Sequence, residues 1–266
     1  MKRSKMSKND FSFIVKQEHP RAQFLPLSFL SLGLVLLVWY IVTATGYVRP
    51  IFLPSPFATA TALWGLLVSG IFFKALLVSF TRIAVATFFA AIVGVILGLS
   101  MGISKKVESF FSPITQPLRY LPITAIIPLL VLWLGIGETM KITFLFFGIV
   151  FYFIPLVSNA VRSTPREYLD VAKSFGSKFE ILIKQVYWPH ALPQIFDGLI
   201  VINGIGWTYV ILAEIINARD GLGYLISIAG RLQRSEEVFA GLILIAAVAI
   251  GSDHILRYIR QKYFFW

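Results

Sequence analysis

The chain has 266 residues, of which 57% are hydrophobic and 14% charged, and its formal net charge is +11. Soluble domains carry about 25% charged residues, so this composition excludes an ordinary soluble protein and predicts one integral membrane domain. The basic residues lie between apolar runs rather than in one patch, which argues against nucleic-acid binding. Because the chain has no cysteine, disulfides, thiol catalysis and cysteine-ligated metals are excluded.

Residues 1–24 are polar and basic, and the first long apolar run follows them. A signal peptide would have a shorter apolar run and a small-residue cleavage site. The run over residues 25–44 is about 20 residues long, enough to cross ~30 Å of hydrocarbon, and no such site follows it. We therefore predict a cytoplasmic tail over residues 1–24 and a single transmembrane domain over residues 25–266.

Six apolar runs are long enough to be transmembrane helices, so the predicted fold class is all-α. The runs lie near residues 25–45, 77–103, 120–136, 141–161, 195–216 and 238–258. Pro122 and Pro128 interrupt the third run, and we expect a kinked or re-entrant helix there. The stretch from Pro54 to the second run is expected to lie along the membrane surface as an amphipathic helix.

The distribution of Lys and Arg predicts the orientation, because cytoplasmic loops of membrane proteins are enriched in both. With a cytoplasmic N-terminus, 17 of the 24 Lys and Arg residues fall on the cytoplasmic side. Seven fall outside: Arg49, Lys74, Arg82, Lys141, Arg219, Arg231 and Arg234. Both termini, and the polar connector between the fourth and fifth runs, are therefore predicted to be cytoplasmic.

That connector, residues 162–193, contains the most polar long stretch in the second half of the chain. Apolar residues recur in it at every third or fourth position, which is typical of a helix, and Gly176-Ser177 interrupts the pattern. We predict two short helices separated by a glycine turn, then Trp188-Pro189 and the fifth span. A connector needs only a few residues. The segment is therefore either a solvated link or a docking site for a partner on its apolar stripe, which comprises Leu169, Ala172, Phe175, Phe179, Leu182, Ile183 and Val186.

The segment from Asp170 to Gly176, followed nine residues later by Val186-Tyr187-Trp188-Pro189, resembles the EAA loop of bacterial ABC importer permeases. That pattern is Glu-Ala-Ala, three residues, Gly, nine residues, an aliphatic residue, one residue, then Leu-Pro. The chain departs from it at Asp170, Val171 and Trp188. In the family this loop seats in a cleft of the cytoplasmic ATPase. The resemblance thus implies an ATPase-coupling role for Asp170, Ala172, Phe175, Gly176, Val186 and Pro189.

Four further blocks, residues 52–56, 79–102, 121–142 and 211–226, are similar in order to the nitrate, sulfonate and taurine permeases of that family. The resemblance implies a five-helix importer core plus an N-terminal helix, in a bacterial inner membrane. It also implies a second permease copy or a paralogue, separate ATPase subunits that carry ATP and Mg, and an extracytoplasmic solute-binding protein. No cofactor is expected on this chain. The implied substrates are small and often anionic: nitrate, bicarbonate, cyanate, taurine or alkanesulfonates, with pyrimidine vitamin precursors as an alternative.

Glu214 ends the fifth span, and an ionisable residue at membrane depth indicates function by default. Either it lies at the outer headgroups or pairs structurally with Arg231 or Arg234, or it takes part in the outer gate. The resemblance favours a gating or pairing role for Glu214 with the segment from Gly221 to Gly223, because a lone glutamate would repel an anion.

Asn203 and Trp207 are four residues apart and share one helix face. They either line the translocation path or make an ordinary interhelical contact. Gly94, Gly98 and Gly102 have the small-xxx-small spacing of close helix packing, within the bundle or across a dimer. A polar group of Asp253, His254 and Arg257 is expected at the membrane edge.

Two other functional classes are alternatives for a chain with several apolar runs. An ion-gradient-driven secondary transporter would need inverted repeats and midplane ionisable or broken-helix sites, and it would leave the connector unexplained. A membrane enzyme would need clustered catalytic side chains, whereas the three histidines are scattered and no metal-ligand or Ser/His/Asp pattern occurs. No phosphate-binding glycine-Lys-Ser/Thr motif occurs either, so ATP would be bound by another chain.

Overall fold

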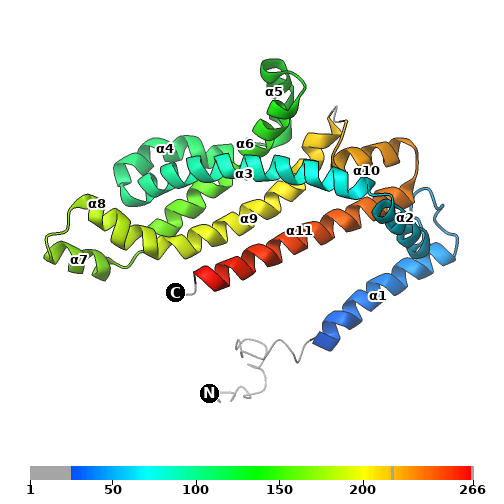
Figure 1. The fold of residues 1–266 in the computed structure, drawn as a ribbon, viewed down its shortest axis with the longest axis horizontal. Helices are drawn as coiled ribbons and strands as arrows, with labels where there is room; N and C mark the ends of the chain where they lie inside the picture. Colours follow the sequence, from blue (N-terminus) through cyan, green and yellow to red (C-terminus); the bar gives the residue numbers. More distant parts are fainter. Residues whose placement is uncertain (1–24, 217–218, 265–266) are drawn as a thin grey trace, which may run out of the picture. The chain divides into compact units, whose positions relative to one another are not determined.

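The computed structural model describes residues 25–216 and 219–264, and these residues form helices joined by short turns (Figure 1). The chain divides into two compact units, residues 1–56 and 57–266, and each is described by itself. The predicted cytoplasmic tail, residues 1–24, lies outside the described residues.

The first unit contains helix α1 (Leu25–Ala44), whose 20 residues match the first predicted span. At ~1.5 Å per residue the helix is about 30 Å long, the thickness of a bilayer core. A turn with Gly46 at φ 68° follows it, and the chain folds back so that Trp39 Nε1 donates to the Pro54 carbonyl at 2.9 Å. The side chains of α1 are mainly exposed within this unit.

The second unit holds all the other elements. They are α2 (Pro56–Val68), α3 (Ile71–Ile103), α4 (Lys105–Leu118), η2 (Ile123–Ile126), α5 (Ile127–Leu134), α6 (Glu138–Arg162), α7 (Arg166–Ser174), α8 (Phe179–Leu182), η3 (Ile183–Tyr187), α9 (Trp188–Ile215), α10 (Leu222–Arg231) and α11 (Ser235–Tyr263). Within the described part of the chain, four helices are long and apolar enough to cross a membrane, or five if the bent pair crosses as one span, whereas the sequence predicted six. An all-helical membrane fold is thereby confirmed.

The second and third predicted spans differ from the structure in their bounds. Helix α3 begins at Ile71 rather than near residue 77, so Lys74, like Arg82, lies inside a helix and not in an outer loop. The third span is a pair, α4 and then η2 with α5, bent by 90° at residues 119–122. The break lies at Pro122, as predicted, whereas Pro128 lies in the first turn of α5, and Pro113 and Pro117 lie inside α4.

Helices α3 and α6 run in the same direction and form the centre of the unit (Figure 1). Their contact is the predicted glycine seam. A Cβ on Gly94, Gly98 or Gly102 would lie within 2.6 Å of Phe153, Val157 or Val161 of α6, so only glycine permits this approach. The seam therefore serves packing within one chain. Helix α9 packs on α6 from the other side, where the ring of Tyr209 covers Gly148.

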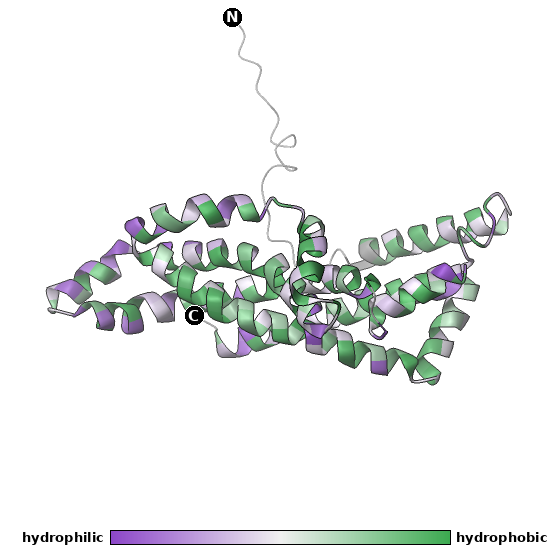
Figure 2. Cartoon of the chain, turned by 90° about the horizontal axis from the view of Figure 1, so that it is seen from above, coloured by the Kyte–Doolittle hydropathy of each residue, from purple (hydrophilic) through white to green (hydrophobic). Residues whose placement is uncertain are grey.

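The hydropathy of the second unit changes along its length. The long helices are mostly hydrophobic, whereas the segment around α7 and α8 is largely hydrophilic (Figure 2). This contrast fits the polar connector that the sequence predicts between two spans.

Candidate functional site

The connector forms the two short helices and glycine turn that its sequence predicts. Helix α7 ends at Ser174, and Gly176 adopts φ 71°, the left-handed conformation that favours glycine after a helix end. The Gly176 and Ser177 amides donate to the carbonyls of Lys173 and Ala172, at 2.8 and 3.2 Å, which satisfies two of the last carbonyls of α7.

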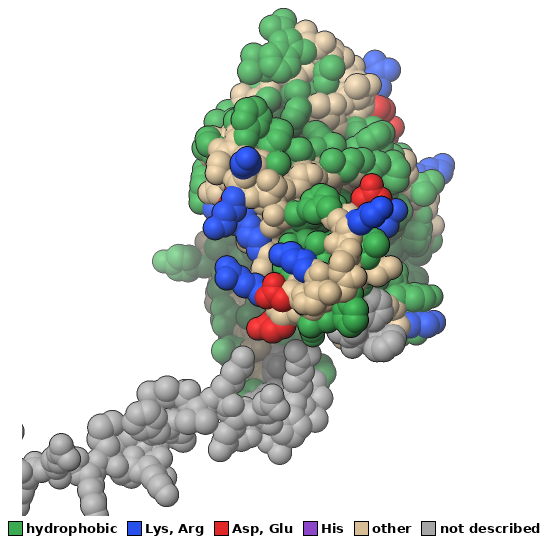
Figure 3. Space-filling view, turned by 90° about the vertical axis from the view of Figure 1, so that its left-hand side faces the viewer, with side chains coloured by type: hydrophobic (Ala, Val, Ile, Leu, Met, Phe, Trp, Pro, Cys, Tyr) green, Lys and Arg blue, Asp and Glu red, His purple; other side chains and the backbone are tan. Residues whose placement is uncertain are grey.

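The apolar stripe of this segment is partly exposed, and four of its members, Leu169, Ala172, Ile183 and Val186, are half-buried. Phe175 is 85% exposed and Phe179 60%, and Val171 and Tyr168 are also exposed, whereas Leu182 is buried. Figure 3 looks onto this end of the second unit, where Lys and Arg side chains lie among hydrophobic ones. Exposed aromatic side chains on a segment without a core of its own indicate an interaction surface.

The sequence suggested that the second helix of the connector ends at Trp188-Pro189, before the fifth span. In the structure it does not end there. Residues Phe179–Ile215 form one helix, with a π-helical turn over Ile183–Tyr187 just before Pro189. A proline in a regular helix clashes with the carbonyl four residues earlier, and the wider π turn removes that conflict. Tyr168 of α7 packs edge-on against His190, 6.2 Å between ring centroids, so α7 is held against the base of α9.

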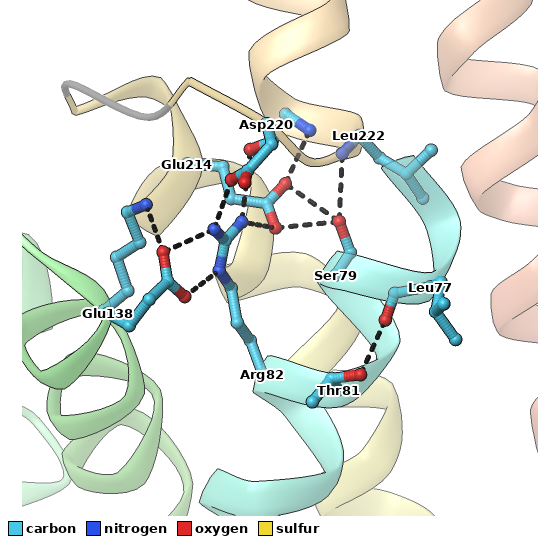
Figure 4. Close-up of polar contacts among 10 residues, drawn as sticks. Leu77, Ser79, Thr81, Arg82, Glu138, Glu214, Asp220 and Leu222 are labelled. Atoms are coloured by element: carbon cyan, nitrogen blue, oxygen red, sulfur yellow. Dashed lines mark hydrogen bonds and ion pairs between the residues drawn. The ribbon is translucent and has the colours of Figure 1, made fainter. Parts of the chain in front are cut away.

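At the opposite end of α3 and α9, Arg82 lies in a cluster of charged groups (Figure 4). Its Nε and Nη2 donate to both carboxylate oxygens of Glu138 at 2.6 Å each. Its Nη1 donates to Glu214 at 2.8 Å and to the backbone carbonyl of Asp220 at 3.1 Å, and Nη2 also pairs with the Asp220 carboxylate. Lys141 adds a third bond to Glu138 at 2.8 Å.

Glu214 is fully buried, and every group around its carboxylate donates to it. Ser79, one turn before Arg82 on α3, donates through its hydroxyl at 2.7 Å, and the amide of Gly223 donates at 2.8 Å. The Ser79 oxygen accepts from the Leu222 amide at 2.9 Å. Side chains of α3 and α9 thus occupy the first amides of α10, where a carboxylate is favourable.

Two glycines make this arrangement possible. Gly221 has φ 103°, and a Cβ there would lie 2.4 Å from the carboxylate carbon of Glu214. A Cβ on Gly223 would lie 2.7 Å from the Ile211 carbonyl. Both positions therefore require glycine, and the chain after α9 is fixed closely against Glu214.

The cluster joins α3, α6, α9 and the start of α10. The sequence suggested Arg231 or Arg234 as the partner of Glu214, and the structure corrects this: the buried partner is Arg82. Arg234 pairs instead with Glu237 at 3.1 Å. Sequence reasoning assigned Arg82 to an outer loop and so missed it. The sequence does contain a signal for a buried polar site, because Arg82 is a charged residue three positions after Ser79 within an otherwise apolar run.

Asn203 and Trp207 lie on one face of α9, as predicted, and contact α11. Asn203 Nδ2 and Trp207 Nε1 both donate to the hydroxyl of Ser252, at 2.9 and 3.0 Å. Trp207 is almost fully buried, whereas Asn203 and Ser252 line a cavity of about 460 Å³ with Phe80, Thr87 and other residues of α3 and α9. The interhelical contact is thus present.

The polar group near the end of α11 is an ion pair within that helix. Asp253 and Arg257 pair at 2.6 Å, whereas His254 contacts the Ile250 carbonyl through Nδ1 at 2.8 Å. A second arginine, Arg260, reaches Asp197 of α9 at 3.0 Å. Both arginines therefore have structural partners.

Residues 90–264, about two thirds of the chain, match the family of binding-protein-dependent transport system inner membrane components. The chain belongs to this family. It is therefore the transmembrane permease subunit of an ABC importer, a multi-pass membrane protein that works with ATPase and binding-protein partners.

Relatives and solved structures agree with the assignment. The taurine transport system permease protein TauC of Escherichia coli is 32% identical over 95% of this permease and 94% of its own length. The putative aliphatic sulfonates transport permease protein SsuC of Bacillus subtilis is 30% identical over 88% and 85%. The inward-facing MetNI methionine ABC transporter is similar in fold, with a TM-score of 0.63, 16% identity, and coverage of 73% of this chain and 95% of that one.

Proposed function

We propose that this permease imports a small sulfonate such as taurine. The observation that supports the substrate class is that TauC and two SsuC permeases of different bacteria match it over most of their lengths, at 30–32% identity. Nitrate, bicarbonate and pyrimidine precursors remain the alternatives within the family. The ion-gradient-driven alternative has no support in these relatives.

The partners of the proposed importer are an ATPase, a solute-binding protein and a second copy of this chain. The surface of α7 and α8 that carries Phe175 and Phe179 is the proposed seat of the ATPase, with Asp170, Ala172, Gly176, Val186 and Pro189 shaping it. ATP and Mg belong on that partner, and this chain hydrolyses nothing and holds no cofactor. A second copy of the chain completes the path, and both termini are cytoplasmic.

The cluster of Arg82, Glu138, Glu214 and Asp220, which we call the arginine clasp, is then at the outer end of the permease. There it holds Gly221 and Gly223 against α9, and these residues form the proposed outer gate. Glu214 acts in pairing and not as a ligand for the anion. Substrate moves when ATP binding draws the coupling segments together and rocks the two permeases, which opens the path outward.

The ATPase seat is tested by co-purification of the ATPase with wild-type permease and with the Gly176→Asp and Ala172→Glu variants. Gly135→Asp is the matched control, because Gly135 has nearly the same φ, 70° against 71°, and both sites are open around the Cβ. We expect loss of the ATPase from the first two variants and retention by the control. Retention by all three would show that α7 and α8 are only a link.

The substrate is tested separately by uptake of labelled taurine into proteoliposomes that contain the permease, its ATPase and its binding protein. We expect ATP-dependent uptake that unlabelled ethanesulfonate inhibits. Uptake of nitrate or a pyrimidine in place of both sulfonates would refute the proposed substrate and leave the importer assignment intact.

A further inference from the structure

A second arginine, Arg119, lies at membrane depth in surroundings unlike those of Arg82. It caps α4, at the break of the bent third span. Its carbonyl accepts a hydrogen bond at 3.1 Å from the hydroxyl of Tyr152. Tyr152 is 14 residues after the first residue of α6 and 10 before the last, or about 21 and 15 Å along the helix axis. Arg119 is therefore near the middle of the span.

The charge of Arg119 is not balanced by any carboxylate among the described residues. Nη2 donates to the hydroxyl of the neighbouring Tyr120 at 2.6 Å, and the guanidinium lies 4.8 Å from that ring. Nε is buried and has no hydrogen-bond partner among the described residues. Arg82, by contrast, binds three carboxylates. An uncompensated cation at membrane depth is costly and marks a functional position.

The non-helical backbone at the break also indicates a functional position. Residues 119–122 are non-helical, and Tyr120 is 74% exposed and Leu121 45% in the single chain. Irregular backbone at this depth cannot face lipid, so it must face another protein surface or a water-filled cavity. Tyr152, whose side chain also interacts with that of Tyr209 on α9, extends the polar groups across two helices.

We propose that Arg119 faces the translocation path and binds the sulfonate group of the substrate as it crosses. This inference rests on the proposed function, which supplies the anionic substrate. A guanidinium presents planar, forked donors that match two oxygens of an oxyanion, and the terminal nitrogens of Arg119 provide them here, whereas its Nε is buried. Tyr152 is a positioning residue, because it holds the Arg119 backbone and does not touch the anion.

The test uses the reconstituted complex of permease, ATPase and binding protein, with labelled taurine as the probe. Arg119→Gln removes the charge, Arg119→Lys keeps it, and Arg49→Gln is the control because Arg49 is an exposed arginine of the first unit. We expect Arg119→Gln to lower uptake at least tenfold and Arg119→Lys to keep about a third or more. Hydrolysis of ATP stimulated by the loaded binding protein should stay within twofold in every variant.

A second measurement separates charge from shape. The chain has no cysteine, so Arg119→Cys places a single thiol that reagents can modify after assembly. We expect a cationic aminoethyl methanethiosulfonate to restore uptake and a neutral methyl reagent not to. The inference would be overturned if the two reagents had equal effects or if uptake and hydrolysis were lost in parallel. It would also be overturned if Arg119→Gln left uptake unchanged, or if both neutral variants failed to assemble. Failure of the wild type to carry either sulfonate would instead refute the proposed substrate.

Discussion

Replacing Arg82 by Met is the sharpest test of the arginine clasp. The variant keeps an unbranched side chain in α3 and removes the cation that Glu214 contacts at 2.8 Å. Glu138 and Asp220 are each 55% exposed, and Glu138 keeps Lys141, so water and the lysine can compensate these two carboxylates. Glu214 is 0% exposed and retains only the donors of Ser79 and Gly223. The cost is therefore set mainly by Glu214.

Breaking a buried ion pair by removal of one partner costs about 3–5 kcal/mol, because an uncompensated charge remains. We expect Arg82→Met to lower the free energy of unfolding by that amount. The double variant Arg82→Met/Glu214→Gln removes the orphaned charge, while the amide oxygen still accepts from Ser79 and Gly223. It should be about 2 kcal/mol more stable than Arg82→Met alone, a coupling typical of residues in one network.

The assay is unfolding of the purified permease by dodecyl sulfate in mixed micelles, followed by circular dichroism. Arg257→Met is the control, since it removes an arginine from an exposed pair within α11 and should hardly move the midpoint. An Arg82→Met variant that unfolds with wild-type permease would contradict the reasoning. So would a double variant no more stable than the single one, because Glu214 would then not depend on Arg82.

Two further predictions concern glycines and use the same assay. Gly221→Ala should lower the free energy of unfolding by about 2–3 kcal/mol, because the added methyl meets Glu214 and the backbone is left-handed. Gly135→Ala is also strained in its backbone but has open space around the methyl, so it should lower the free energy of unfolding by only about 1 kcal/mol. Equal costs would show that the contact with Glu214 is unimportant. Gly98→Ala should lower stability by about 1–3 kcal/mol, because its methyl would overpack the seam with α6. Gly65→Ala in α2, where nothing lies within 4 Å, should be neutral or slightly stabilising, and the reverse order would refute the seam.

The features that the sequence predicted correctly depend on local patterns. The turn at Gly176 follows from a break in a helical stripe, the seam from glycines four residues apart, and the bent span from Pro122 and its neighbours. Each is decided by residues within a few turns of one another. The ATPase seat, by contrast, stays a prediction, because it depends on contacts with a separate chain.

The arginine clasp could not be predicted from one sequence in the same way. Its partners are 56, 132 and 138 residues from Arg82 along the chain, and no local periodicity relates positions so far apart. Treating every charge as a loop marker also placed Arg82 outside the membrane. The buried Glu214 was recognised as unusual, but the choice of its partner depends on how α3 packs beside α9.

The two candidate sites lie at opposite ends of one helix, and this constrains how a signal can pass between them. Residues Phe179–Ile215 are continuous, about 55 Å at ~1.5 Å per residue, and reach from the coupling segment to Glu214. The close seam of α3 with α6, and the clasp that ties both to α9, leave little freedom for these helices to slide individually. A force applied at α7 should therefore tilt the three helices as one body. On this reasoning, the proposed outer gate opens by rotation of these helices as one body, and loosening Arg82 should uncouple ATP hydrolysis from uptake before it abolishes either.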